Sequence, residues 1–221
     1  PRINYYHQNN QDAYNALNRG LSLTTGRFIA ILNSDDVYAV TRLQRLAEYC
    51  LETGAQCVFT DVTPISDDGA EFTDPEFGWN IWHSNNRSFY FSCNDLYTAF
   101  LNGNFMVTTS NLFLSAEAVA EIGKFCSLRY LHDYDFILRC LLRFPEQVRY
   151  LSDEKLLYYR IHSGNTLGEA AIAGRIQDRE LIAKYLQLGL PEEFRGKAAA
   201  AAERLIALGD ELHEVRSVVD E

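Results

Sequence analysis

Two apolar runs on either side of an amphipathic segment constrain the fold more than any other feature of this sequence. RFIAIL (27–32) and QCVFTDV (56–62) are bounded by turn-forming residues, as is typical of strands buried in a parallel sheet. Between them, apolar residues recur at helical spacing over 40–53, and Gly54 is expected to end that helix. A helix over 11–26 precedes the first run. This order, with its short connections, predicts an α/β protein with a parallel sheet.

The rest of the chain predicts further elements around that unit. In order, they are a polar hairpin turn over 66–72, an irregular aromatic-rich stretch over 79–91, a helix over 94–101, a loop feeding a strand before 115, a short helix ended by Gly123, a helix over 132–144, a pair of strands around a turn at 152–154, and helices from 167 onward. Residues 1–166 are therefore predicted to form the core and 167–221 a C-terminal helical extension.

Composition excludes several classes of protein. The sequence has 20 Lys and Arg against 30 Asp and Glu, a formal net charge of −10, and no basic run, which argues against general nucleic-acid binding. Its five cysteines form no CxxC pair and indicate reduced thiols in a cytosolic compartment. No apolar run reaches the roughly 18–20 residues of a transmembrane helix, and no signal peptide is evident. The expected location is the cytoplasm, free or peripheral to the inner face of the membrane.

The first apolar run leads into an acidic turn, NSDD, which holds Asn33, Asp35 and Asp36. Ligands of open α/β sheets bind outside the carboxyl ends of the strands. Adjacent carboxylates there are hard oxygen ligands that suit Mg²⁺ or Mn²⁺ bridging a diphosphate. An Asx turn or a helix N-cap explains the same four letters equally well.

The surrounding sequence resembles a known family. HQNNQDAYNALNRGLSLTTGRFIAILNSDDVYAVTRLQRL resembles the core of the family 2 glycosyltransferases of the GT-A fold, with its Asn-rich turn, small-residue helix and acidic strand ending. LHDYDFILR resembles the family's later acidic helix, and YYRIHSGNT its terminal Arg-x-His stretch. The resemblance implies a mixed, mostly parallel sheet flanked by helices. It also implies transfer of a sugar, with inversion, from a nucleotide-diphosphate donor to a hydroxyl in polysaccharide or glycoconjugate synthesis.

Carried over to the matching positions, the resemblance assigns a role to each candidate residue. Asp133 is expected to be the general base, with Asp135 as runner-up; Asp36, Asp35 and His162 to hold Mg²⁺ or Mn²⁺; and Asp35, Asn33, Asn10, Arg19 and Arg160 to bind the donor. Apart from the resemblance, Trp79 and Trp82 are expected to bind a glycan, lipid-linked or protein acceptor, because aromatic faces suit the apolar faces of pyranose rings. The hydroxyl of Thr109 is expected to line the same acceptor site. Structural roles compete with these: a helix N-terminal charge for Asp133, a salt bridge for Arg160, and a small satellite core for the tryptophans.

Three departures qualify the resemblance. Asn33 stands where the family has its first aspartate, and His132 stands where it has a glutamate. The family's opening apolar strand, and the next strand ending in Asp-Asp-Gly-Ser, do not precede Pro1, so the core is expected to be incomplete at its N-terminus. An open sheet edge would then favour a homo-oligomer. The alternative function is a non-catalytic, transferase-like scaffold or partner-binding fragment of a larger enzyme. A metal-dependent phosphatase or nucleotidyl transferase ranks last.

Overall fold

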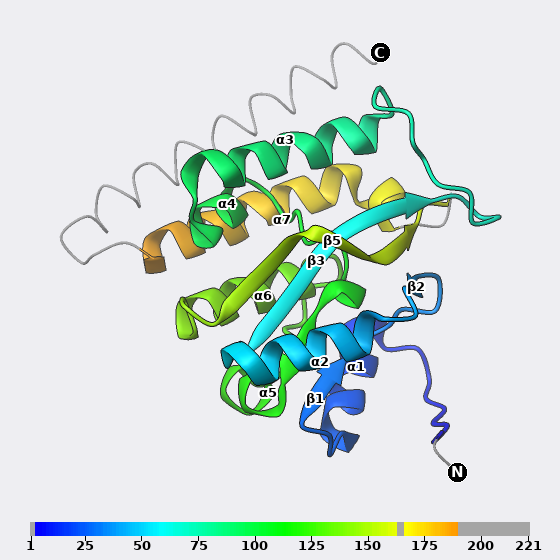
Figure 1. The fold of residues 1–221 in the computed structure, drawn as a ribbon, viewed down its shortest axis with the longest axis vertical. Helices are drawn as coiled ribbons and strands as arrows, with labels where there is room; N and C mark the ends of the chain where they lie inside the picture. The colour runs from blue at the N-terminus through cyan, green and yellow to red at the C-terminus, as the bar shows by residue number, and fades with distance from the viewer. Residues whose placement is uncertain (1–2, 163–165, 190–221) are drawn as a thin grey trace.

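The chain folds into a five-stranded mixed sheet flanked by helices (Figure 1). The structure, a computed structural model, describes residues 3–162 and 166–189, and the side chains of the last helix from residue 178. Its elements are α1 (Asp12–Leu23), β1 (Phe28–Ala30), β2 (Val37–Tyr38), α2 (Arg42–Thr53), β3 (Cys57–Ile65), α3 (Gly78–Cys93), α4 (Leu96–Asn102), the 3₁₀ turn η1 (Thr109–Asn111), β4 (Phe113–Ser115), α5 (Ala116–Ile122), α6 (His132–Arg143), β5 (Val148–Arg160) and α7 (Thr166–Gly189).

The sheet has the order β1-β4-β3-β5-β2. The α/β class and the mixed sheet are confirmed, but parallel pairing is confined to β3 and β5. The two apolar runs, predicted to be strands of one parallel sheet, run in the same direction but do not pair with each other. The short strand β4 lies between β1 and β3 and pairs antiparallel with both. β1 consequently lies at an edge of the sheet.

A second difference concerns β5, which is one strand of 13 residues and not a pair of strands around a turn. Leu151 pairs with Thr60 and Lys155 pairs with Asp61, so residues 152–154 have no partner on β3. The polar stretch that suggested a turn is therefore a bulge, which bends the strand without reversing it.

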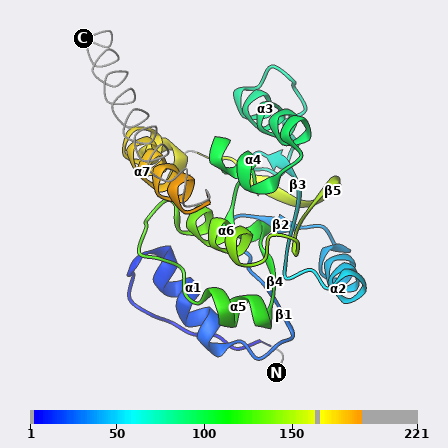
Figure 2. The same ribbon diagram turned by 90° about the vertical axis from the view of Figure 1, so that its left-hand side faces the viewer.

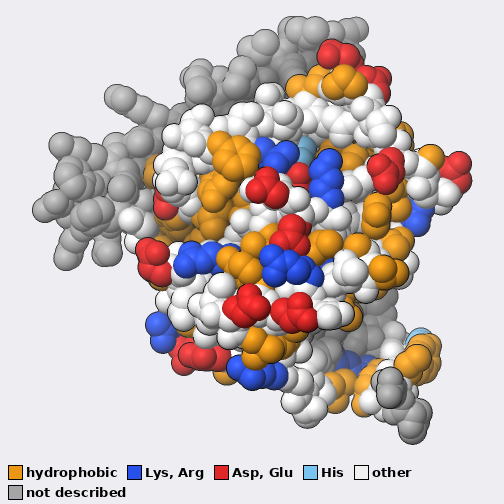
Figure 3. All heavy atoms as spheres, in the orientation of Figure 1, with side chains coloured by type: hydrophobic (Ala, Val, Ile, Leu, Met, Phe, Trp, Pro, Cys, Tyr) orange, Lys and Arg blue, Asp and Glu red, His pale blue; other side chains and the backbone are white. Residues whose placement is uncertain are grey.

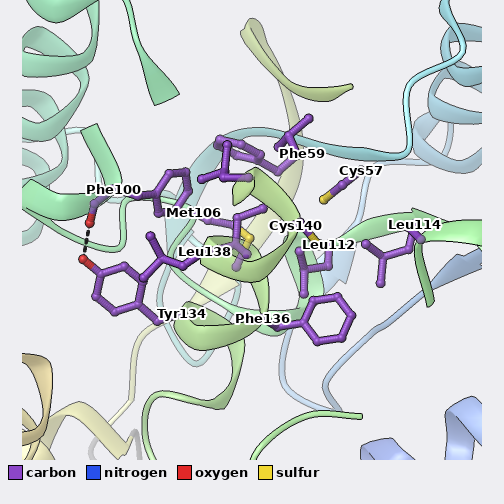
Figure 4. Packing of buried hydrophobic residues seen from close by; sticks show 14 of the residues in the cluster. Cys57, Phe59, Phe100, Met106, Leu112, Leu114, Tyr134, Phe136, Leu138 and Cys140 are labelled. Carbon is purple, nitrogen blue, oxygen red and sulfur yellow. Dashed lines mark hydrogen bonds between the residues drawn. The ribbon is translucent and has the colours of Figure 1, made fainter. Parts of the chain in front are cut away.

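The core forms on both faces of β3, all of whose residues are buried. Cys57 and Phe59 pack into the main cluster with α6, whereas Val58 packs with Leu46 and Cys50 of α2. This is the alternation expected of a strand covered on both sides, and Figure 2 shows α2 and α6 on opposite sides of the strands. Figure 4 shows the main cluster, in which aromatic and aliphatic side chains from β3, α4 and α6 meet.

The helix over 79–91 was not expected. The predicted irregular stretch is α3, which runs for 16 residues. Its two buried side chains, His83 and Asn86, are polar, whereas Ile81, Trp82 and Phe91 are exposed. The inward side of this helix is mixed: Trp79, Tyr90 and Cys93 pack against the apolar clusters beside the two polar residues, so no continuous apolar stripe marks the helix in the sequence.

The helix α7 packs on the core through its C-terminal half. Leu181 and Tyr185 belong to the main cluster, and the Tyr185 hydroxyl donates to Asp135 Oδ1 of α6 at 2.7 Å. The helix predicted from residue 191 lies outside the described residues. Within residues 3–162 and 166–189, none of the helices has the length and apolar character needed to cross a membrane.

Candidate active site

The acidic turn after β1 is fastened to the rest of the fold by Asp36. Its Oδ2 accepts hydrogen bonds from Ser110 Oγ (2.6 Å) and Thr108 Oγ1 (3.1 Å), and its Oδ1 accepts one from the backbone N–H of Arg160 (3.2 Å). Asn33 strengthens the same contact, since its side-chain amide donates to Thr108 Oγ1 at 3.0 Å. The carboxylate is buried, which raises its pKa, and the bonds from Ser110 and Arg160 oppose that rise.

Asp35 is the accessible carboxylate of the pair. Its side chain is 40% exposed, and its Oδ2 lies 3.2 Å from His162 Nε2. The structure thus brings together two predicted site residues from the end of β1 and the end of β5, which lie 127 positions apart. Arg160 stands beside them, but its guanidinium donates to the backbone oxygens of Asp35, Ser66 and Asp67. Those bonds shape the turn after β3.

Asp133 lies in the first turn of α6 and is only 7% exposed. Burial raises its pKa, while the neighbouring His132 and hydrogen bonds from the Tyr134 backbone and the Asn104 side chain lower it. Thr109 Oγ1 lies 3.2 Å from His132 Nε2. The triplet 108–110 therefore contacts the acidic turn through its first and third residues and the start of α6 through its second.

The two N-terminal candidates, Asn10 and Arg19, make their hydrogen bonds within the N-terminal segment. Asn10 Oδ1 accepts a hydrogen bond from the Asp12 backbone at the start of α1, and Arg19 donates to the backbone oxygen of His7. In the part of the chain that the structure describes, neither side chain contacts Asp35 or His162. Their donor-binding role stays a prediction.

The two tryptophans differ in accessibility. Trp79 stacks on His83, with ring centroids 4.8 Å apart, and on Tyr159, 6.2 Å apart. It also packs against the apolar cluster of Val62 and Leu157. Trp82 is 40% exposed. Packing thus occupies Trp79, whereas Trp82 is accessible at the surface.

Asp135, the alternative base, has a structural setting. It binds Arg139 Nε at 2.7 Å and Tyr185 Oη at 2.7 Å, with Lys184 Nζ at 3.4 Å. Burial opposes ionisation, but the Tyr185 hydrogen bond and the charge of Arg139 outweigh it and lower the pKa. Its carboxylate joins α6 to α7.

Two buried polar clusters were missed at the level of sequence. Arg42 is fully buried and donates to Thr60 Oγ1 and to the Asn111 backbone and side-chain oxygens. Asp61, in the middle of β3, lies 3.5 Å from His83 Nε2 and 3.3 Å from Arg87 of α3. The available signals were an arginine four positions before Leu46 on the inward side of α2, and an aspartate within an otherwise apolar strand.

The fit of a metal ion depends on Asp35 and His162. Among residues 3–162 and 166–189, no group of three or more His, Cys, Asp or Glu side chains is placed to hold a metal. Mg²⁺ is often bound by only one or two protein carboxylates, with substrate phosphates as further ligands. Asp35 and His162 fit that kind of site. Both carboxylate oxygens of Asp36, by contrast, accept hydrogen bonds from protein donors.

A cavity of about 240 Å³ lies elsewhere, near the start of β5, and is lined by Tyr90, Tyr97 and Tyr150 among others. It contains none of the predicted site residues. The predicted site residues therefore lie away from this cavity.

Comparison with solved structures shows the same fold. S. aureus TarS 1–349 in complex with UDP-GlcNAc superposes with a TM-score of 0.59 at 16% identity, covering 92% of this chain and 55% of that one. The crystal structure of S. aureus TarS 1–349 gives a TM-score of 0.54 at 15% identity, covering 88% of this chain and 51% of that one. The complex with UDP gives 0.53 at 16% identity, covering 86% and 50%. This chain thus spans about half the length of these structures. No curated protein matches its sequence.

The model of glycosyl transferase family 2 matches residues 1–114. That segment is more than half of the 221 residues and includes the acidic turn and the triplet 108–110, whereas Asp133 and His162 lie beyond it. With the mixed α/β fold of the solved structures, this match confirms the resemblance seen in the sequence: the chain belongs to the family 2 glycosyltransferases.

Proposed function

We propose that this chain is the catalytic part of an inverting, nucleotide-sugar-dependent glycosyltransferase. One observation carries the proposal: the triplet 108–110 binds Asp36 of the acidic turn and, through Thr109, His132 beside Asp133. An acidic pair suited to a diphosphate and a carboxylate suited to proton abstraction are thereby held by one short segment. TarS, whose structures contain UDP-GlcNAc and UDP, shares the fold and supports a nucleotide-sugar donor.

The donor side of the proposed site consists of Asp35 and His162, with Asp36 and Asn33 fixing the turn that presents Asp35. Mg²⁺ or Mn²⁺ bound there would neutralise charge on the leaving diphosphate. The chain's own contribution is orientation. Arg160 binds the backbone oxygen of Asp35, and its backbone N–H binds Asp36, so the end of β5 holds the turn in place.

Asp133 is proposed to accept the proton of the attacking hydroxyl. A general base must be ionised at working pH and must lie within hydrogen-bond reach of that proton. Burial raises the pKa of Asp133, which makes its carboxylate a stronger base. The acceptor is proposed to be a glycan, a lipid-linked sugar or a protein, with Trp82 and Thr109 near it, and the reaction to take place in the cytoplasm.

Isothermal titration of the protein with UDP, with and without Mn²⁺, tests the donor site. We expect Mn²⁺ to strengthen UDP binding. Replacing Asp35 with Asn should remove most of that gain, a loss of roughly tenfold or more, because one anionic ligand is lost. Asp153→Asn is the matched control, since Asp153 is an exposed aspartate of the β5 bulge. Equal effects of the two substitutions would contradict the assignment of Asp35.

A non-catalytic role is the second candidate, and the low exposure of Asp133 and the presence of Asn33 favour it. A scaffold predicts no UDP binding under any metal condition and no dependence on Asp35. The same titration therefore separates the two candidates.

A further inference from the structure

Arg42, the first residue of α2, is a fully buried arginine that connects three segments of the chain. Its Nη1 donates to Thr60 Oγ1 of β3 at 2.9 Å, and its Nη2 donates to the backbone oxygen and to Oδ1 of Asn111 at 2.9 and 3.1 Å. The planar guanidinium suits this arrangement, because its donors have fixed directions and bind acceptors on two segments at once. Asn111 directly follows the triplet 108–110, so Arg42 ties the segment that binds Asp36 to α2 and β3.

Asn111 carries this contact to both ends of the triplet. Its Nδ2 donates to the backbone oxygens of Thr60 and Met106 at 2.9 and 3.0 Å, and its Oδ1 accepts from the backbone N–H of Thr60 at 3.1 Å. Both Asn111 and Met106 are fully buried. The two ends of the segment 107–110 are therefore held to each other and to β3 by the residue that Arg42 binds.

Tyr38 forms a second route from Arg42 to the acidic turn. The guanidinium carbon lies 4.8 Å from the centroid of the Tyr38 ring, a distance at which a cation is attracted to an aromatic face. The Tyr38 hydroxyl hydrogen bonds with the backbone oxygen of Ile31, close to the start of the acidic turn, and lies 3.2 Å from the backbone oxygen of Ser110. Ser110 Oγ in turn donates to Asp36. Both routes from the guanidinium thus end at the contact between the triplet and the acidic turn.

The guanidinium of Arg42 is costly to bury. Burial lowers its pKa to about 10, so the group is still positively charged at pH 7. Within residues 3–162 and 166–189, its buried Nε has no hydrogen-bond partner, and no aspartate or glutamate forms an ion pair with it. A buried charge without an opposite charge destabilises the folded state, and apolar residues of similar volume often replace buried charges without loss of stability. An arginine at this position is explained if its hydrogen bonds order the neighbouring site.

We propose that Arg42 is a positioning residue for the donor side of the site. Its guanidinium holds the triplet 108–110 where that triplet binds Asp36, which keeps Asp35 oriented toward a metal ion and a diphosphate. Arg42 is fully buried, so it acts through these residues and contacts no ligand itself. This inference rests on the proposed function, in which Asp35 contributes to donor binding.

Amide hydrogen exchange in the ligand-free protein tests the positioning. The backbone N–H of Asn33 donates to Ser110 Oγ at 2.9 Å and reports on the contact between the acidic turn and the triplet. In Arg42→Met, we expect this N–H to exchange roughly tenfold faster, because the triplet loses its fixed position. The N–H of Phe144, which binds the backbone oxygen of Cys140 at the end of α6, should exchange at the wild-type rate. Faster exchange of both amides by the same factor would indicate global destabilisation and overturn the inference.

Titration with UDP tests the consequence for the donor. The measured quantity is the ratio of the UDP dissociation constants without and with Mn²⁺. We expect Arg42→Met to lower this ratio by roughly fivefold or more, because Asp35 is no longer held in place. A merely structural role would reduce the amount of folded protein and leave the ratio of the folded molecules unchanged, and that result would overturn the inference.

Arg45→Met is the matched control for both measurements. Arg45 is a partly exposed arginine of the same helix, and it binds Glu154 at 2.6 Å instead of the triplet. The same substitution there removes a guanidinium from α2 without touching the proposed route. We expect wild-type exchange at Asn33 and a wild-type Mn²⁺ ratio in this variant. Effects as large as those of Arg42→Met would overturn the inference.

Arg42→Lys keeps the test decisive if Arg42→Met does not fold. Its ammonium retains the charge but is a single point of donation, so it cannot reach Thr60 and Asn111 in the geometry of the guanidinium. We expect the same two effects at a smaller size, roughly two- to threefold. Wild-type exchange at Asn33 together with a wild-type Mn²⁺ ratio in Arg42→Lys would overturn the inference.

The two proposals fail separately. Exchange at Asn33 needs no ligand, so it tests the role of Arg42 even if UDP does not bind. Faster exchange at Asn33 alone, in a protein that binds no UDP under any metal condition, would support the positioning and reject the proposed function. Wild-type exchange in Arg42→Met, when Mn²⁺ strengthens UDP binding to the wild type, would reject the positioning and leave the proposed function standing.

Discussion

Asp36 belongs to the acidic motif, yet its hydrogen bonds give it a structural role. Three donors, the hydroxyls of Ser110 and Thr108 and the N–H of Arg160, converge on its buried carboxylate. Two of these donors come from the triplet 108–110 and the third from the end of β5, so Asp36 fixes the acidic turn against both. The neighbouring Asp35 is left accessible. The two adjacent aspartates have divided their roles because their environments differ.

Removing the Asp36 side chain should therefore destabilise the fold. We expect Asp36→Ala to lower the free energy of unfolding by about 1–3 kcal/mol, because buried donors lose their acceptor. Urea denaturation at pH 7 measures this. Asp36→Asn keeps the shape and one acceptor oxygen, and its cost should be much smaller.

The stability difference between the wild type and Asp36→Asn should depend on pH, because the pKa of Asp36 is raised in the folded state. A folded-state pKa above the ordinary value of 3.8 means that ionisation costs stability at neutral pH. As the pH falls from 7 toward 3.8, the wild type should gain stability relative to Asp36→Asn. A relative loss over this range would show that the charge itself stabilises the turn.

At the scale of elements, polar side chains add to apolar packing in attaching two helices. Helix α3 is attached to β3 by the contacts of His83 and Arg87 with Asp61. Burial lowers the pKa of His83, so this histidine resists protonation. Helix α7 is attached to α6 by Tyr185 and Lys184, which bind Asp135. Apolar periodicity alone would predict neither position.

We expect Tyr185→Phe to weaken the α6–α7 contact, lowering the free energy of unfolding by about 1–2 kcal/mol at pH 7, because the buried Asp135 carboxylate loses a donor. The pKa of Asp135 is lowered in the folded state. Its stabilisation is therefore present above the ordinary value of 3.8 and is lost as the pH falls below it. The difference in free energy of unfolding between the wild type and Tyr185→Phe should therefore shrink as the pH falls below 3.8.

Tyr5→Phe, at an exposed tyrosine of the N-terminal segment, is the matched control for chemical denaturation. If UDP-dependent turnover fell in Tyr185→Phe while its stability stayed unchanged, the helical extension would have a direct part in the reaction. That result would contradict the assignment of the Tyr185 contact to packing.

At the scale of the whole molecule, charge and open edges matter most. The net charge is −10, and Figure 3 shows acidic and basic side chains interspersed on one face of the molecule, with no continuous basic surface there. A nucleotide diphosphate therefore approaches a protein of its own sign. The strand β1 lies at an edge of the sheet. Pairing of two copies of the chain through that edge stays a prediction.

We expect metal-free UDP to bind more tightly as ionic strength rises from 0.01 to 0.15 M, by a factor of roughly 2–5, because the Debye length shortens from about 30 to 8 Å and screens the repulsion. Titration of UDP beside uridine, which is uncharged, checks this. Uridine binding should not change. Weaker UDP binding at higher salt would reveal a local cationic site that outweighs the net charge.

Local information sufficed wherever a residue's role depends on its neighbours in sequence. Gly54, with φ +73°, ends α2 as expected. The polar turn after β3 forms around Ser66, and the amphipathic stretch at 132–144 forms α6. The acidic turn and the helix carrying Asp133 were identified for the same reason, since each motif is contiguous along the chain.

The sequence by itself determined the α/β class, most of the helices and the residues on which the proposed chemistry rests. Only the tertiary structure decided that β4 separates β1 from β3, that residues 152–154 bulge, and that Asp35 meets His162 while Asp36 is buried. These outcomes depend on hydrogen bonds between residues distant in sequence, and no local pattern encodes such a partner.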